Sequence, residues 1–159
     1  MSVQPVAPSH RFVRISGLLV IIAGVALVIA GGVTWSAVAS HLAAENITVS
    51  DDAAAFGGQT VDTPWEAFAQ AEIINDHALE ATGGKTYAEL DKEDPLRAVA
   101  MNGSFLRASL FTSVVAFGVA ALVVGVGVLF GLVGLALRRL APAAPVAPAR
   151  TDENRLASV

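Results

Sequence analysis

The chain has 159 residues, 54% of them hydrophobic, and a net charge of −4, so it is too apolar for an ordinary soluble domain of this length. It has no cysteine, which excludes disulfides, thiolate catalysis, iron–sulfur clusters and cysteine-ligated zinc. The segment 40–107 holds twelve acidic and four basic residues, a net charge of −8, so nucleic acid is not an expected partner.

The first apolar block follows an N-terminal tail, 1–14, which we place in the cytoplasm. Ile15–Trp35 is 21 residues without a charge. As a helix it would measure about 32 Å, close to the ~30 Å hydrocarbon thickness of a bilayer. We expect a transmembrane helix over 15–39 that continues to about Ala44. A signal peptide cleaved after Ala39 is the alternative, but its apolar core of about 20 residues exceeds the usual h-region of about 7–15.

Glycines predict where the two membrane helices pack. A spacing of seven residues suits a left-handed antiparallel pair, and small residues let helix backbones approach closely in lipid. One pair in the second block, Gly127 and Gly131, also forms a GxxxG motif. The predicted packing positions are Gly17, Gly24 and Gly31 in the first span and Gly118, Gly125, Gly127 and Gly131 in the second.

The segment 40–107 is predicted to be an acidic, helical, extracytoplasmic loop. Its clearest signal is Thr63-Pro64-Trp65-Glu66, which combines an N-cap threonine, a proline at the first helical position and a glutamate at the third. We expect a helix from Pro64 to about Thr82, ended by Gly83-Gly84. Its apolar face should pack on the membrane hairpin, a second copy or another protein, and its predicted contact residues are Trp65, Phe68, Ile74 and Leu79.

Two more helix starts follow in the loop. Thr86-Tyr87-Ala88-Glu89 reads as a second capping box that opens a short helix to about Lys92. Asp94-Pro95 starts a third helix, for which we expect a kink or short break at Asn102-Gly103-Ser104 before the second span. A direct run into that span is the alternative.

The second span is predicted over 108–137, within which Leu110–Leu137 is uncharged. As a helix this uncharged run would measure about 42 Å, more than the thickness of the hydrocarbon layer, so it must tilt or protrude. The segment 138–159, rich in alanine and proline, is expected to be a disordered cytoplasmic tail. Basic residues beside the spans favour the cytoplasmic side, with Arg107 as a weak counter-signal, and four arginines set the orientation: Arg11, Arg14, Arg138 and Arg139.

No motif in the chain predicts catalysis or a cofactor. Gly83-Gly84-Lys85-Thr86 resembles the end of a phosphate-binding loop, but Leu79 stands where that loop needs a glycine. Asp76, His77 and Glu80 place one histidine beside two carboxylates, whereas a metal site usually needs a second histidine on the same face. We therefore expect a solvated charged face, with no enzyme activity, metal or cofactor.

The stretches HALEATGGKTYAELDKEDPLR and SFLRASLFTSVVAFGVAAL resemble a family of small two-pass membrane proteins from actinobacteria. The likeness extends loosely over residues 11–140 and implies the same two-span topology. Some members carry an automatic label as aromatic ring-opening dioxygenases. This sequence does not support that label, because a non-haem iron site needs two histidines and a carboxylate, and only His41 and His77 are in the outer region.

These patterns predict an all-α membrane protein, an antiparallel two-helix transmembrane hairpin with a helical extracytoplasmic insertion. We expect a non-enzymatic structural or accessory protein of the plasma membrane, with both termini in the cytoplasm. Its expected partners are the lipid bilayer and itself or another membrane protein, the latter bound through the spans and the helix 64–82. The alternative is a homo-oligomeric channel or transport component, which would need several copies because neither span is charged.

Overall fold

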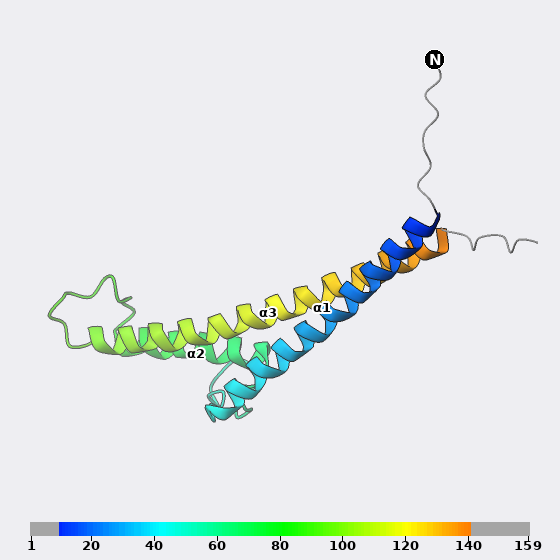
Figure 1. The fold of residues 1–159 in the computed structure, drawn as a ribbon. Helices are drawn as coiled ribbons and strands as arrows, with labels where there is room; N and C mark the ends of the chain where they lie inside the picture. The colour runs from blue at the N-terminus through cyan, green and yellow to red at the C-terminus, as the bar shows by residue number, and fades with distance from the viewer. Residues whose placement is uncertain (1–9, 141–159) are drawn as a thin grey trace, which may run out of the picture.

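A computed structural model describes residues 10–140, and this part of the chain is all-helical. Residues 1–9 and 141–159 of the two predicted tails lie outside these residues, whereas 10–14 and 138–140, also predicted as tail, belong to the first and last helices. The long helices α1 and α3 run side by side, and α2 lies along the opposite end of α3 (Figure 1). The described helices are α1 (His10–Ala44), α2 (Pro64–Ala81) and α3 (Arg97–Leu140).

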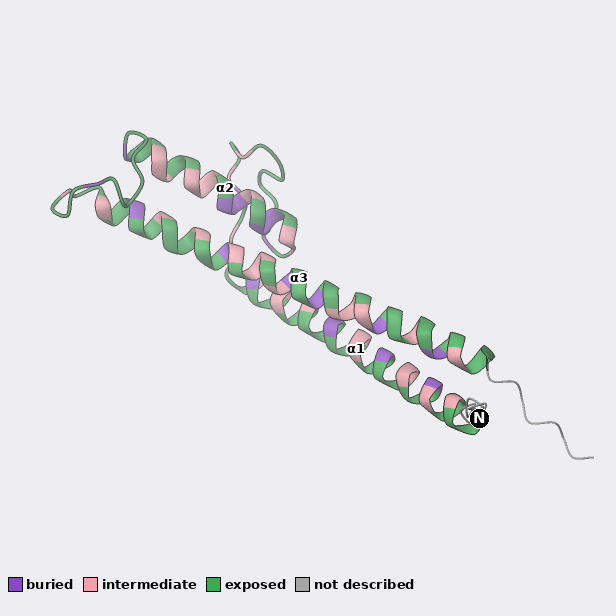
Figure 2. Cartoon of the chain, turned by 90° about the horizontal axis from the view of Figure 1, so that it is seen from above, coloured by how far each residue is buried: buried purple, intermediate pink, exposed green. Residues whose placement is uncertain are grey.

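A seam of small residues joins α1 to α3. A methyl group built on Gly24 would lie 2.6 Å from the carbonyl oxygen of Gly127, so the two backbones are in direct contact there. Early residues of α1 meet late residues of α3, so the helices pack antiparallel. Buried positions recur at intervals along both helices (Figure 2). The facing positions, spaced by seven on each helix, are Gly17 with Gly134, Gly24 with Gly127, and Gly31 with Ala120.

Outside this seam, α1 and α3 present apolar side chains to their surroundings. The most apolar windows of the two helices have a mean hydropathy of 2.6, and only 11% and 17% of their residues are buried inside the chain. At 1.5 Å per residue, α1 measures about 52 Å and α3 about 66 Å. Both are therefore long and apolar enough to cross a membrane, and neither is the buried core helix of a globular domain.

Both ends of α2 form as the sequence predicts. The Thr63 side chain accepts a hydrogen bond from the Trp65 amide, and the Glu66 carboxylate accepts one from the Thr63 amide at 3.1 Å. At the other end the amides of Gly83 and Gly84 bond back to the carbonyls of Glu80 and Leu79, with φ of 65° and 84° at the glycines. This is a Schellman motif, in which glycine is favoured because φ is positive. The GGKT sequence is thus a helix stop.

The apolar face of α2 packs antiparallel against the first half of α3. Ala67 and Ala71 are completely buried. Phe68 meets Phe111 edge to face with ring centroids 5.7 Å apart. Toward the other end of α2, a methyl group on Gly103 would lie 2.8 Å from the Ala78 side chain. The partner of this face is therefore the protein's own third helix.

A small core forms where the three helices meet. The cluster contains Leu42 from α1, Ala67 and Ala71 from α2, Leu110 and Phe117 from α3, and Val49 and Val61 from the connection between α1 and α2. Val49 and Val61 are buried because the chain crosses itself there: an isolated antiparallel bridge pairs Thr48 with Thr60. The connection between α1 and α2 therefore contributes two buried side chains to the core.

The predicted short helix after Thr86 is wrong. The capping contact itself exists, since the Thr86 amide and hydroxyl donate to the Glu89 carboxylate at 2.8 and 2.7 Å, but 83–96 forms turns. A single helical turn has a nucleation cost that no further turn offsets. The Arg97 guanidinium also donates hydrogen bonds to the carbonyls of Tyr87 and Leu90, at 3.2 and 2.7 Å. In a helix these carbonyls would accept from backbone amides four residues later.

The predicted break at Asn102-Gly103-Ser104 is also wrong, because α3 runs unbroken from Arg97 to Leu140. The helix begins after Asp94, whose carboxylate accepts a hydrogen bond from the Leu96 amide at 2.9 Å. Gly103 is a close-packing position against α2, as its approach to Ala78 shows. The Ser104 hydroxyl donates to the Ala100 carbonyl within the helix. Packing of α2 along this stretch stabilises it as helix despite its poor intrinsic propensity.

Gly24 and Gly32 offer a matched pair of substitutions in one helix. Gly24→Ala forces a methyl group against the Gly127 carbonyl, whereas a Cβ at Gly32 meets nothing within 4 Å. We expect Gly24→Ala to lower the free energy of unfolding by roughly 1–3 kcal/mol through overpacking. Gly32→Ala should be neutral or stabilising, because alanine favours helix. Thermal unfolding in mild detergent measures both, and equal effects of the two substitutions would contradict the seam.

Candidate functional site: an aromatic groove beside α2

A groove of about 480 Å³ opens between α2, α3 and the loop that precedes α2. Its walls are mostly apolar, with Glu72 and Asp76 the only charged side chains that line it. We call it the aromatic groove and define it by Ala54, Ala55, Phe56, Pro64, Trp65, Phe68, Ala69, Glu72, Ile73, Asp76 and Val114. Three aromatic side chains that line it, those of Phe56, Trp65 and Phe68, are largely exposed.

Phe56 reaches the groove through an unfavourable backbone conformation. Its φ is 64°, in the left-handed region that costs a residue with a Cβ on the order of 1–2 kcal/mol. The turn is held by hydrogen bonds of the loop, from the Gln59 amide to the Phe56 carbonyl at 3.0 Å and from the Gly58 amide to the Val49 carbonyl at 2.9 Å. The surrounding structure therefore fixes an exposed aromatic ring in a strained position.

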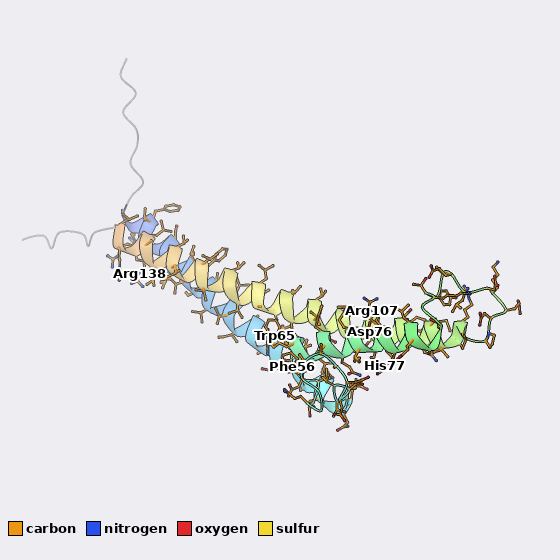
Figure 3. All side chains as sticks on the ribbon, turned by 180° about the vertical axis from the view of Figure 1, so that it is seen from behind. Phe56, Trp65, Asp76, His77, Arg107 and Arg138 are labelled. Carbon is orange, nitrogen blue, oxygen red and sulfur yellow. The ribbon has the colours of Figure 1, made fainter. Side chains whose placement is uncertain are left out.

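The groove lies part of the way along the molecule. In Figure 3, Arg138 marks one end, Phe56 and Trp65 come next along the long axis, and Asp76 and His77 lie beyond them. The groove includes Val114, which precedes Arg138 by 24 residues of continuous helix, about 36 Å. On the neighbouring helix Trp35 packs on Phe117, with ring centroids 4.7 Å apart. Aromatic side chains thus gather around one level of the helix pair.

The loop that carries Phe56 is tied to α2 at two points. The Ser50 amide donates to the Gln70 side chain at 2.9 Å, and the His77 imidazole Nε2 bonds the Asp52 carboxylate at 2.7 Å. The hydrogen bond to Asp52 raises the pKa of His77 above its ordinary 6.5, and the negative charges of Asp52, Glu80 and Asp76 act in the same direction. The same hydrogen bond lowers the pKa of Asp52 below 3.8.

Two arginines of α3 contact α2 and the loop 83–96. Arg107 lies 3.6 Å from Glu72 of α2 and 5.2 Å from the Phe111 ring centroid. Arg97 lies 3.9 Å above the Tyr87 ring and binds two carbonyls of the loop 83–96, as described above. Both basic residues are therefore occupied by structural contacts within the chain.

A second groove, of about 670 Å³, lies between the end of α1 and the middle of α3. Its lining mixes apolar side chains with polar ones, including His41, Gln70, Thr112 and Ser113. The two hydroxyls donate to carbonyls of their own helix, at 2.8 and 3.3 Å, and Gln70 is committed to Ser50. Its other polar lining residues are His41, Glu45 and Ser109.

The arrangement does not assemble reactive groups. Within residues 10–140, no three histidine, aspartate or glutamate side chains lie together as a possible metal site. His77 bonds to Asp52 of the loop before α2, and not to Asp76 or Glu80 beside it on the helix. What the site offers chemically is an apolar surface with acidic side chains at one end.

The predicted contact residues are distributed over several surfaces. Trp65 and Phe68 line the aromatic groove, Ile74 the second groove, and Leu79 a third groove near Lys85. Of the glycines, Gly17, Gly24, Gly31 and Gly127 lie in the α1–α3 seam, and Gly131 places its backbone nitrogen beside Gly24. A Cβ on Gly118 or Gly125 meets nothing within 4 Å.

Sequence reasoning missed four residues of these contacts: Gly134 and Ala120 in the seam, and Phe56 and Gln70 around the loop. The spacing of seven from Gly127 would have identified the first two. Gln70 gave no such signal, because it lies at the edge of the apolar face of α2, beyond Ala81. Phe56 had no sequence signal, because a left-handed phenylalanine is rare.

The contact between His77 and Asp52 should make the loop most stable at mildly acidic pH. Because the pKa of Asp52 is lowered in the folded chain, Asp52 stabilises the folded loop above pH 3.8, and this stabilisation is lost as the pH falls through the lowered pKa. Because the pKa of His77 is raised, His77 stabilises the folded loop below pH 6.5, and this stabilisation is lost as the pH rises through the raised pKa. We expect the hydrogen-exchange protection factor of the Gly58 amide to peak between these values.

The control is His77→Gln, which keeps a hydrogen-bonding side chain but does not titrate. It should flatten the pH dependence of the Gly58 protection factor while α2 remains protected. A native protein whose loop protection stays constant from pH 3.8 to well above 6.5 would contradict the role of this contact.

Comparison of the chain with protein-family models, with curated proteins and with solved structures finds no match. Its function is inferred from its own chemistry: the close-packed seam of α1 and α3, the exposed apolar faces of those helices, and the aromatic groove beside α2.

Proposed function

We propose that the chain is a non-enzymatic structural or accessory protein of the plasma membrane. In this proposal α1 and α3 cross the bilayer as an antiparallel hairpin, with both termini in the cytoplasm and 40–107 outside. The observation that carries it is the low burial of the most apolar windows of both helices, 11% and 17%. So much exposed apolar surface has a large free-energy cost in water and none in hydrocarbon.

The charges support the proposed orientation. Arg11 and Arg14 stand at one end of α1, and Arg138 and Arg139 stand at the adjacent end of α3. Arginines so placed favour the cytoplasmic side. The opposing arginine, Arg107, lies near Glu72, so it is part of a pair in the acidic outer region.

Glycines on the outer faces of the pair support association with another membrane protein or a second copy. Gly118 and Gly125 are exposed, seven residues apart, and a Cβ on either meets open space. The glycines of the seam, by contrast, contact the backbone of the facing helix. Small residues on a lipid-facing surface permit close approach of another helix.

The channel alternative receives no support from the polar residues of the helices. It would need several copies whose polar groups line a common path. One copy supplies few such groups near the outer ends of the spans, four hydroxyls that each donate to a carbonyl of their own helix: Thr34 to Ala30, Ser36 to Gly32, Thr112 to Ala108 and Ser113 to Ser109.

The topology can be tested with single cysteines, because the native chain has none. Asp91→Cys lies in the proposed outer loop, and Thr151→Cys in the proposed cytoplasmic tail. In intact cells a membrane-impermeant maleimide should label the cysteine at 91, whereas the cysteine at 151 should react only after the membrane is permeabilised. The reverse pattern would invert the orientation, and release of the protein by alkaline carbonate would contradict insertion.

Association can be tested with Gly125→Leu. Because a side chain at this position meets no atom of its own chain, we expect unchanged unfolding but weaker crosslinking, in native membranes, to a copy or to a co-purifying protein. Gly32→Leu is the control, since a Cβ on Gly32 of α1 also meets nothing within 4 Å, but the residues one heptad away are Val25 and Ala39 and not a second exposed glycine. A native protein that is strictly monomeric and captures no partner in membranes would overturn the accessory role.

A further inference from the structure

We infer that the aromatic groove is a second membrane contact of this protein, in which Phe56, Trp65 and Phe68 rest among the lipids of the outer leaflet. The inference rests on the proposed insertion of α1 and α3, and it adds a surface that neither helix provides. The occupant of the groove is lipid, the headgroup region and upper acyl chains, and not a protein segment.

The first reason is the height of the groove. Val114 lies in the groove and precedes Arg138 by 24 residues of α3, about 36 Å of helix. A common tilt of about 20° would shorten this only to about 34 Å. With Arg138 at the cytoplasmic interface, the ~30 Å hydrocarbon layer ends just below the groove, and the headgroups surround it. Trp35, packed on Phe117, lies slightly lower, at the same boundary.

The second reason is continuity of the surface. Val114 is half-buried, and Gly118 and Ala121, one and two turns further along the same side of α3, are exposed, so the groove opens onto the apolar face that the proposal places in lipid. Tryptophan is enriched at this depth because its ring is apolar and its indole N–H finds polar partners. Phe56 adds an exposed ring on a backbone with a positive φ of 64°, held in place by the hydrogen bonds of its loop.

The third reason is the distribution of charge. The acidic residues of the groove, Glu72 and Asp76, lie on α2 two and three turns beyond Trp65, away from the proposed bilayer. The basic residues of the outer region, Lys85, Lys92, Arg97 and Arg107, lie on or beyond the part of α3 that α2 covers, and none lines the groove. The contact is thus apolar, and it should form on neutral lipid and persist in high salt.

Tryptophan fluorescence tests this contact on the full-length chain in phosphatidylcholine vesicles. The chain has two tryptophans, so Trp35→Phe leaves Trp65 as the single reporter. Two matched reporters add Trp65→Phe to that variant and place the tryptophan elsewhere. Phe105→Trp has the same exposure, 65% against 66% for Trp65, but lies nine residues, about 14 Å, beyond Val114 on α3. Leu122→Trp reports insertion of the helix pair.

We expect lipids brominated near the headgroup end of the acyl chain to quench Trp65, shift its emission to shorter wavelength and protect it from aqueous acrylamide. The reporter at 105 should remain open to acrylamide and insensitive to bromine. If Leu122→Trp is quenched but Trp65 is not, the helices insert and the inference fails. If neither is quenched, the proposed insertion fails as well. A Trp65 shielded from acrylamide but unquenched by lipid would show that protein covers the groove, which also overturns the inference.

Discussion

The direct backbone contact between Gly24 of α1 and Gly127 of α3 is the constraint on which the rest of the structure depends. It repeats one heptad away in each direction, and it brings two long apolar helices together through their smallest residues. Because the seam uses glycine and alanine, more than half of the large apolar side chains of the two helices are left exposed. The same feature that joins the helices therefore leaves the exposed apolar surface on which the proposed membrane insertion rests.

The seam also sets how far α3 extends past the end of α1, and therefore where α2 packs. α1 ends at Ala44, whereas α3 extends back to Arg97, well beyond the proposed membrane. That free length of α3 is the support for α2, which packs along it through Ala67, Ala71 and Ala78. The level at which Trp65 and Phe56 lie is thus decided by the pairing of α1 and α3.

Sequence reasoning was most accurate where a local hydrogen-bonding pattern decides the structure. The capping box of Thr63 and the glycine stop at Gly83 are complete within a few residues, so both ends of α2 were predictable. The same reasoning failed at Thr86. The capping contact to Glu89 forms there without a helix, and Arg97 donates to carbonyls of the same loop. The reasoning failed again at Gly103, where packing against Ala78 outweighs low helix propensity.

The sequence by itself determined the class of the protein: two uncharged stretches of membrane length, an acidic region between them, arginines at the tail ends and a capped helix. Composition and periodicity suffice for these because each depends on residues that are close in the chain. Only the tertiary structure decided which small residues face each other, that His77 pairs with Asp52, and that Phe56 joins Trp65 in one groove. Those contacts join residues distant in sequence, and their partners are selected by shape and register.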